Sequence, residues 1–185
     1  DIHQQGAFAA RLYVPPYVEP WEPNIDPAII AGVSALGSSI AFDLIAQGKK
    51  GISIASTYDA WTPSRAYAHY HGALRILSET ASARLATPIE VPFPSLVAGI
   101  GYHSGVKSWN FPSLWMGGKW GIGDIVEYQT AAAMALLHSA AKERERYLSN
   151  FWAINSRAVA GSKDVFAYLL PEPELPKSLA EDEKR

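Results

Sequence analysis

Two residues at the ends of strand-like segments could take part in metal or acid–base chemistry. His3 belongs to an Asp-x-His unit, in which an imidazole can bind a metal ion while Asp1 serves as an outer partner. On its spacing alone, His3 is more typical of a surface histidine beside a chain terminus. Glu79 ends the run 74–79, where a lone carboxylate is expected to be partly buried. Buried carboxylates are costly and concentrate at functional sites, unless a nearby arginine or a backbone cap pairs with them.

The remaining histidine and glycine motifs do not match known metal-binding, phosphate-binding or catalytic patterns. His69 and His71 form a His-x-His pair, but residues two apart on a helix point in different directions. His103 and His138 are isolated, and His138 falls in an amphipathic helix. Gly117-Gly118-Lys119 lacks the strand and the spacing of a phosphate-binding loop, and there is no G-x-S-x-G motif of a serine hydrolase.

The composition limits the number of domains, the partners and the metal ligands that the chain can have. The 185 residues suit one domain, and 48% hydrophobic with 18% charged residues is the balance of a globular protein. A net charge of −2 gives no basic excess for a nucleic-acid backbone, so we expect no nucleic-acid partner. With no cysteine, histidine and carboxylate are the strong metal ligands available. We expect no membrane span, since the apolar runs are short beside the roughly 20 residues a bilayer requires.

The elements that must position these residues alternate between helix and strand. Asp26-Pro27 predicts a helix start, and Gly48 predicts its end. Between them apolar residues recur at spacings of three and four: Ile29, Ile30, Val33, Leu36, Ile40, Leu44 and Ile45. A short strand is expected within 51–57, one or two helical turns within 64–71, and a second strand within 73–78. This pattern favours an α/β fold.

The rest of the chain combines long loops with one further helix. The proline-rich segment 15–23 predicts an extended surface loop. Residues 86–121 form the longest irregular stretch, and its three tryptophans argue against disorder. Asp124 and Glu127 match a capping box that opens a helix lasting until shortly before Gly161. A strand is expected at 165–170, followed by a polar linker.

Several short motifs resemble zinc carboxypeptidases in their order along residues 1–160. They are Asp1-Ile2-His3-Gln4-Gln5-Gly6, the segment from Arg11-Leu12 to Pro15-Pro16-Tyr17, Tyr58-Asp59-Ala60-Trp61, Ile76-Leu77-Ser78-Glu79-Thr80, and Trp115-Met116-Gly117-Gly118-Lys119-Trp120 leading to Tyr128. The 21-residue step from Tyr58 to Glu79 carries much of the resemblance. The family implies a three-layer α/β/α sandwich with a mixed sheet.

The resemblance also implies roles for individual residues. His3 would be one ligand of a single Zn²⁺ ion, with a His-x-x-Glu pair expected upstream supplying the others. Glu79 would be the general base, and Tyr58 would match the mobile tyrosine that closes over the peptide substrate. The position that sets specificity falls on Ser64 or Arg65. If Arg65 lines the pocket, acidic C-terminal residues should be preferred.

The resemblance predicts that this chain is the C-terminal part of a catalytic domain. Residues 1–161 would belong to that domain and 162–185 to a strand and linker, so the fragment alone should lack activity. Bacterial members of the family favour a periplasmic or secreted location. Two alternatives are a catalytically silent member that binds peptides or cell-wall fragments and an amidase acting on peptidoglycan or amino-acid conjugates. In the silent member, the tryptophan-rich segment 109–120 would form a recognition surface rather than a packed lid.

Overall fold

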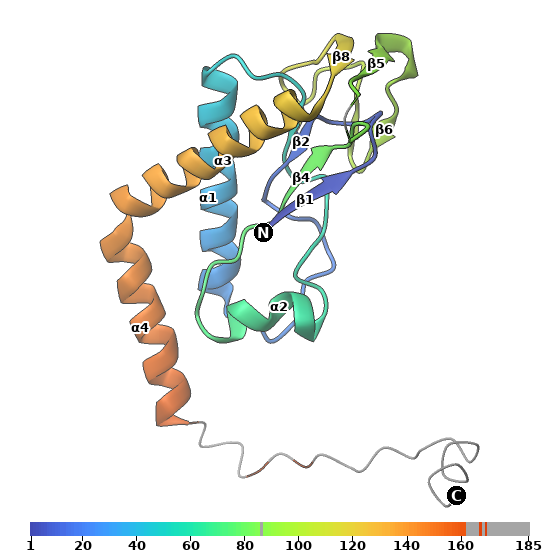
Figure 1. Ribbon diagram of the computed structural model, residues 1–185. Helices are drawn as coiled ribbons and strands as arrows, with labels where there is room; N and C mark the ends of the chain where they lie inside the picture. Colours follow the sequence, from blue (N-terminus) through green and yellow to red (C-terminus); the bar gives the residue numbers. More distant parts are fainter. Residues whose placement is uncertain (86, 162–166, 168, 170–185) are drawn as a thin grey trace, which may run out of the picture.

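A computed structural model describes residues 1–85, 87–161, 167 and 169, and it alternates helices with short strands (Figure 1). In chain order the elements are β1 Ile2–Gln5, β2 Leu12–Tyr13, α1 Pro27–Ala46, β3 Ile52–Ser53, α2 Pro63–Tyr70, β4 Ser78–Ala81, β5 Ile89–Pro92, a 3-10 turn Phe93–Ser95, β6 Ala98–Gly99, β7 Tyr102–His103, β8 Gly117–Trp120, α3 Ile122–Lys142 and α4 Arg144–Ala160.

A mixed four-stranded sheet in the order β1-β4-β2-β3 forms the centre of the described fold. β1 runs parallel to β4 and β2 runs parallel to β3, whereas β2 and β4 are antiparallel. In the β1–β4 register His3 lies opposite Glu79. The predicted α/β class with a mixed sheet is therefore confirmed.

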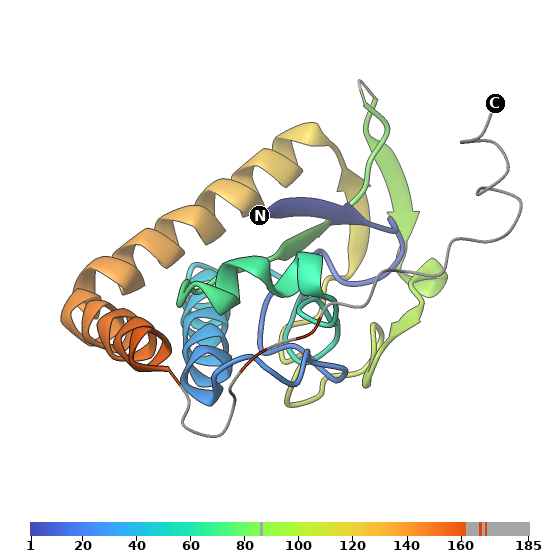
Figure 2. The ribbon, with the colours of Figure 1, turned by 90° about the horizontal axis from the view of Figure 1, so that it is seen from below.

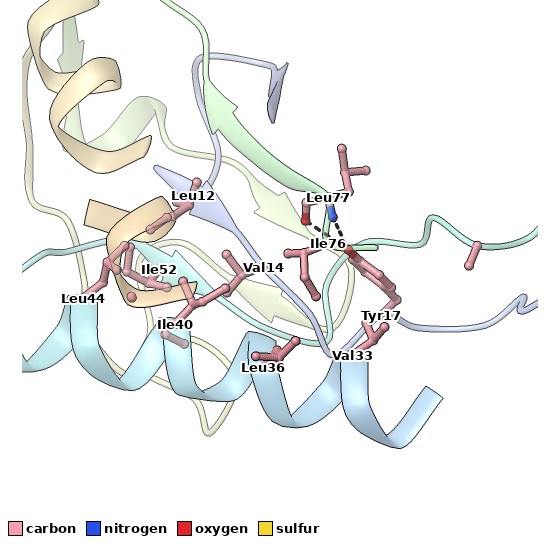
Figure 3. Close-up of a cluster of buried hydrophobic side chains, with 14 of the residues drawn as sticks. Leu12, Val14, Tyr17, Val33, Leu36, Ile40, Leu44, Ile52, Ile76 and Leu77 are labelled. Atoms are coloured by element: carbon pink, nitrogen blue, oxygen red, sulfur yellow. Dashed lines mark hydrogen bonds between the residues drawn. The ribbon is translucent and has the colours of Figure 1, made fainter. Parts of the chain in front are cut away.

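Helices α1 and α3 cover one face of this sheet (Figures 1 and 2). Gln129 of α3 accepts a hydrogen bond from the Ser78 hydroxyl at 2.8 Å and donates one to Thr80. Side chains alternate between the two faces of a strand, so Glu79, which lies between these residues, points to the opposite face. The main hydrophobic core lies between the sheet and these two helices, where α1 contributes Val33, Leu36, Ile40 and Leu44 (Figure 3).

The predicted first helix is confirmed as α1. The Asp26 side chain accepts a hydrogen bond from the Ala28 backbone N–H at 2.8 Å and caps the helix, and Pro27 occupies its first turn. With 20 residues, α1 is long and apolar enough to cross a membrane on length and composition alone, so the expectation that no apolar run approaches that length was too strict. In the structure one side of α1 packs in the core, as a buried helix of a globular fold does.

The opposite face of the sheet carries loops and short strands within the described residues. Tyr13 forms a second buried cluster with Ala10, Tyr102 and Phe111 on that face, whereas its neighbour Leu12 faces the core under α1. The segment around β6 and β7 therefore packs where a three-layer sandwich would place helices. The mixed sheet is established, and the sandwich remains a proposal.

Several predicted boundaries were wrong. The strand expected within 73–78 begins only at Ser78, so Glu79 lies inside β4. In the same way, His3 lies inside β1 rather than at its end. The stretch 86–121 contains four short strands in two antiparallel pairs, β5 with β8 and β6 with β7.

The predicted capping box was misplaced by three residues. The helix begins after Gly121, whose backbone N–H donates to the Asp124 carboxylate at 2.8 Å, so Asp124 is in the first turn rather than at the cap. Glu127 instead pairs with Lys49. The single long helix is also divided at Glu143 into α3 and α4.

The proline-rich segment 15–23 is extended as expected, but it is only partly a surface loop. Tyr17 is buried, and its hydroxyl donates to the Leu77 carbonyl at 3.1 Å and accepts from the Leu77 N–H at 2.6 Å (Figure 3). This pair of bonds fastens the segment to the chain just before β4. The expected linker and all but two residues of the strand expected at 165–170 lie outside the described residues.

Candidate functional site

The sheet brings His3 and Glu79 together from positions 76 residues apart in the sequence. Both residues occupy matched positions of adjacent parallel strands, so their side chains leave the same face of the sheet. His3 Nδ1 lies 3.1 Å from Glu79 Oε2. The predicted candidates thus form one pair, on the face of the sheet opposite α1 and α3.

The two members of this pair differ in exposure. The His3 side chain is 51% exposed and the Glu79 side chain only 17% exposed. His3 Nδ1 also lies 3.1 Å from the backbone carbonyl of Gln4, so two oxygen acceptors face this one ring nitrogen. Such a setting favours the proton on Nδ1 and leaves the lone pair of Nε2 free. An imidazole oriented by a carboxylate in this manner is a common arrangement for a metal ligand.

Tyr58 lies on the loop between β3 and α2. Its side chain is 47% exposed, and its ring packs edge-on against Trp61 with a centroid distance of 6.2 Å. None of the hydrogen bonds among the described residues joins Tyr58 to His3 or Glu79. The structure therefore places Tyr58 on an exposed loop but leaves its role in substrate binding as a prediction.

Arg65 lies in the first turn of α2, where the Thr62 hydroxyl accepts a hydrogen bond from its backbone N–H. Its guanidinium is partly exposed, and Nη1 donates to Asp59 Oδ1 at 3.2 Å. Ser64, the other residue predicted for the specificity position, bonds through its hydroxyl to Thr62 instead. Arg65 is thus a cation at the surface that already shares its charge with a neighbouring carboxylate.

Sequence reasoning missed Asp59 as part of this region. Asp59 is fully buried, and its second oxygen pairs with Nη1 of Arg75. Arg75 Nη2 in turn donates to Asp1 Oδ2 at 2.6 Å. A buried carboxylate needs partners, and the arginines at 65 and 75 were the available signal in the sequence.

Tyr17 lies close to both the Asp59 ion pairs and Glu79. Burial raises the pKa of its hydroxyl above the ordinary value, and the Asp59 and Glu79 carboxylates raise that pKa further, while Arg75 opposes them. The Tyr17 hydroxyl consequently keeps its proton and its hydrogen bonds to Leu77 over the physiological pH range. Tyr17 is thus a neutral partner of the backbone directly before β4.

The residues present fit a zinc centre in donor type but supply only part of one. Zinc prefers imidazole, carboxylate and thiolate donors, and a catalytic zinc site has three protein ligands and an open position. Within the ranges 1–85 and 87–161, no group of three or more His, Asp or Glu side chains could hold a metal ion. His3 could therefore provide one ligand, and any further ligands would have to come from outside these residues.

The other singled-out residues serve packing roles. His69 is buried in α2 with Nδ1 bonded to the Ala73 carbonyl at 3.0 Å, while His71 is exposed at the end of that helix. Trp115 and Trp120 pack around the buried Arg11 guanidinium at 4.1 and 4.9 Å from their ring centroids.

The burial of these two indole rings favours a packed segment over a recognition surface for most of residues 109–120. Only Trp109 of its three tryptophans is largely exposed, at 75%.

Comparison with known proteins leaves the family open, because no family model, curated protein or solved structure matches the chain.

Proposed function

We propose that the chain is the C-terminal part of the catalytic domain of a zinc carboxypeptidase with a three-layer α/β/α sandwich. The observation that carries the proposal is the contact between His3 and Glu79 across β1 and β4. These are the residues that the family resemblance assigns to a zinc ligand and the general base. Two independent motifs far apart in the sequence thus meet at hydrogen-bond distance.

The chemistry would be hydrolysis of the C-terminal peptide bond of a peptide substrate. A zinc ion bound in part by His3 would lower the pKa of a water molecule to about 7 and polarise the peptide carbonyl. Glu79, on the face of the sheet opposite α1 and α3 and mostly shielded from solvent, would accept a proton from the attacking water. It would then return that proton to the leaving amine.

The remaining predicted residues would act on the substrate. Tyr58 is half-exposed on its loop, so its hydroxyl is free to reach a peptide and donate a hydrogen bond. Arg65, which is also partly exposed, would line the specificity pocket and favour an acidic C-terminal side chain.

The test uses the full-length protein and measures zinc by elemental analysis together with release of C-terminal amino acids from N-blocked dipeptides. We expect about one zinc per chain, and a loss of about 10²- to 10⁴-fold in kcat for Glu79→Gln with zinc retained, because general-base catalysis contributes that much. His3→Ala should lower the zinc content. Glu145→Gln, whose side chain is 90% exposed on α4, is the matched control and should change neither quantity.

The other possible outcomes each contradict one part of the proposal or point to a different function. Full activity in Glu79→Gln would overturn its assignment as the base. Peptide binding without zinc or cleavage would identify the silent binding member. Cleavage of peptidoglycan peptides or amino-acid conjugates, with ordinary dipeptides left intact, would identify an amidase.

A further inference from the structure

A continuous series of ion pairs connects the Tyr58 loop with the strands that carry His3 and Glu79. Asp59, the residue after Tyr58, is fully buried and pairs through its two oxygens with Arg65 and Arg75. Arg75 uses its other terminal nitrogen to bind Asp1, with 2.6 Å between Nη2 and Oδ2.

The positions of these residues explain why the series reaches the candidate site. Arg75 lies three residues before β4, and Asp1 directly precedes β1. Asp1 lies two residues before His3 in the sequence. The ion pairs therefore run from the loop to the residue that directly precedes the strand carrying His3.

Burial constrains the centre of this series, where Asp59 is fully buried and Arg75 is mostly buried. A fully buried carboxylate must keep its charged partners, because an unpaired buried charge is very costly. The Arg75 guanidinium can bond Asp59 and Asp1 only in a narrow range of orientations, since its donors form a planar fork. Backbone bonds from Val18 to Thr57 and from Glu22 to Ala60 hold the chain on either side of Tyr58. Within residues 1–85 and 87–161 no hydrogen bond or ion pair fixes the Tyr58 side chain itself, which is half-exposed and packs against Trp61 on the same loop.

We propose that Asp59 is a positioning residue whose ion pairs with Arg65 and Arg75 hold the Tyr58 loop in a fixed place relative to the His3–Glu79 pair. Asp59 acts through Tyr58 and does not touch substrate. The effect on loop order follows from the geometry alone, and only its effect on catalysis rests on the proposed function.

The first test measures hydrogen exchange in the full-length protein and needs no activity. Asp59→Asn keeps the shape of the side chain and removes its charge. We expect amide exchange in residues 57–62 to become at least about tenfold faster, while α1 keeps its wild-type rates, because the loop opens locally. Unchanged exchange in the loop would overturn the proposal, and so would equal acceleration in the loop and in α1, which would indicate general destabilisation.

A second variant keeps the test decisive if Asp59→Asn alone fails to fold. Asp59→Asn combined with Arg75→Gln removes both members of the buried pair and leaves no uncompensated charge between them. This double variant should also accelerate amide exchange in residues 57–62. Glu145→Gln, at the exposed surface of α4, is the control and should leave exchange in that loop unchanged. A double variant with a fully protected loop would overturn the proposal.

The second test asks whether Asp59 acts through Tyr58. With a dipeptide substrate, Asp59→Asn should lower kcat/KM about tenfold when Tyr58 is present and should add little in a Tyr58→Phe background. Equal losses in both backgrounds would contradict action through the tyrosine. If the wild-type protein cleaves no peptide, the proposed function fails, and the exchange measurement still decides the role of Asp59.

Discussion

The Arg65 guanidinium is partly exposed to solvent and forms an ion pair with the buried Asp59 carboxylate. A guanidinium in this setting can still attract an anionic side chain, although part of its charge is already compensated. On the proposed function, we therefore expect the full-length protein to cleave peptides ending in Glu faster than those ending in Leu, by a factor of about 10 or less given the modest value of exposed ion pairs.

Arg65→Gln should remove this difference, as judged from the ratio of the two kcat/KM values. Ser64→Ala is the neighbouring control and should preserve the ratio. A preference of the wild-type protein for C-terminal Lys would contradict a role for Arg65 in the proposed pocket.

His69 links stability to pH at the residue scale. Burial lowers the pKa of its ring below the ordinary value, and the Ala73 carbonyl only partly offsets this effect. In the unfolded chain the pKa is about 6.5, so below that pH the unfolded state binds more protons than the folded state. The contribution of the neutral His69 ring to the free energy of unfolding is therefore fully present above pH 6.5. It decreases as the pH is lowered toward the pKa of the folded state.

Urea denaturation at pH 7.5 and pH 5.5 measures this effect. The wild-type midpoint should decrease between the two values, and His69→Asn, which can still donate to the Ala73 carbonyl, should decrease less. His71→Asn alters an exposed ring and should follow the wild-type slope. Equal slopes for wild type and His69→Asn would show that His69 does not titrate on unfolding.

The sequence allowed His3 and Glu79 to be singled out because each follows a recognisable local pattern. The Asp59–Arg75 pair was missed because its members are 16 residues apart and meet only through the folded loop. Arg65 and Arg75 were the available partners in the sequence, but neither Asp59 nor Arg75 belongs to a periodic pattern that would show which charges meet. The contact between His3 and Glu79 likewise depends on strand order, which the sequence did not specify.

At the scale of elements, Gly37 permits α1 to approach the proline-rich segment. A Cβ at this position would lie 2.2 Å from the Pro15 carbonyl oxygen, which is backbone and cannot move aside easily. We expect Gly37→Ala to destabilise the protein by about 1–3 kcal/mol, because the steric cost exceeds the gain in helix propensity of about 1 kcal/mol.

Gly123 provides a matched comparison within the first turn of α3. A Cβ there would meet nothing within 4 Å, so Gly123→Ala should be neutral or stabilise the protein by up to about 1 kcal/mol. Thermal or urea unfolding of both variants measures the contrast. Similar effects at the two glycines would contradict the close approach of α1 to Pro15.

Gln129 is the contact by which α3 fixes β4 around Glu79. Its amide bonds to Ser78 on one side of Glu79 and to Thr80 on the other, and all three of these polar groups are buried. Gln129→Met keeps the approximate volume but leaves both hydroxyls without this partner, and we expect a loss of about 1–3 kcal/mol in unfolding free energy. Val126→Gln, on the exposed side of α3, should cost much less.

Helices were easier to predict than strands. The amphipathic period of α1 spans 20 residues and is bounded by a capping aspartate and a glycine, so both ends were found to within a few residues. The strands contain two to four residues each, too few for an alternating pattern to be distinctive. The break between α3 and α4 at Glu143 has no proline or glycine to signal it.

On the scale of the whole molecule, the alternation of helix and strand patterns along the sequence correctly indicated an α/β chain. The layer on the far face of the sheet could not be predicted, because Tyr13, Tyr102 and Phe111 come from separate loops and strands. Their shared burial arises from aromatic packing between distant segments. Fold class was therefore accessible from local patterns, and the arrangement of layers was not.

The separation of 76 residues between His3 and Glu79 has a kinetic consequence. Contacts between distant residues carry a loop-closure cost that local helix formation does not. In pulse-labelled refolding we expect amides of α1 to gain protection before those of β1 and β4. Protection of β1 before α1 would contradict this order.

During synthesis the same constraint sets the time at which the pair can be completed. Gln129 is made fifty residues after Glu79, and β4 takes its final support from that side chain. A nascent chain synthesised as far as Glu79 therefore contains both His3 and Glu79 before it contains α3, the helix that supports β4. The candidate site should mature only after α3 has left the ribosome.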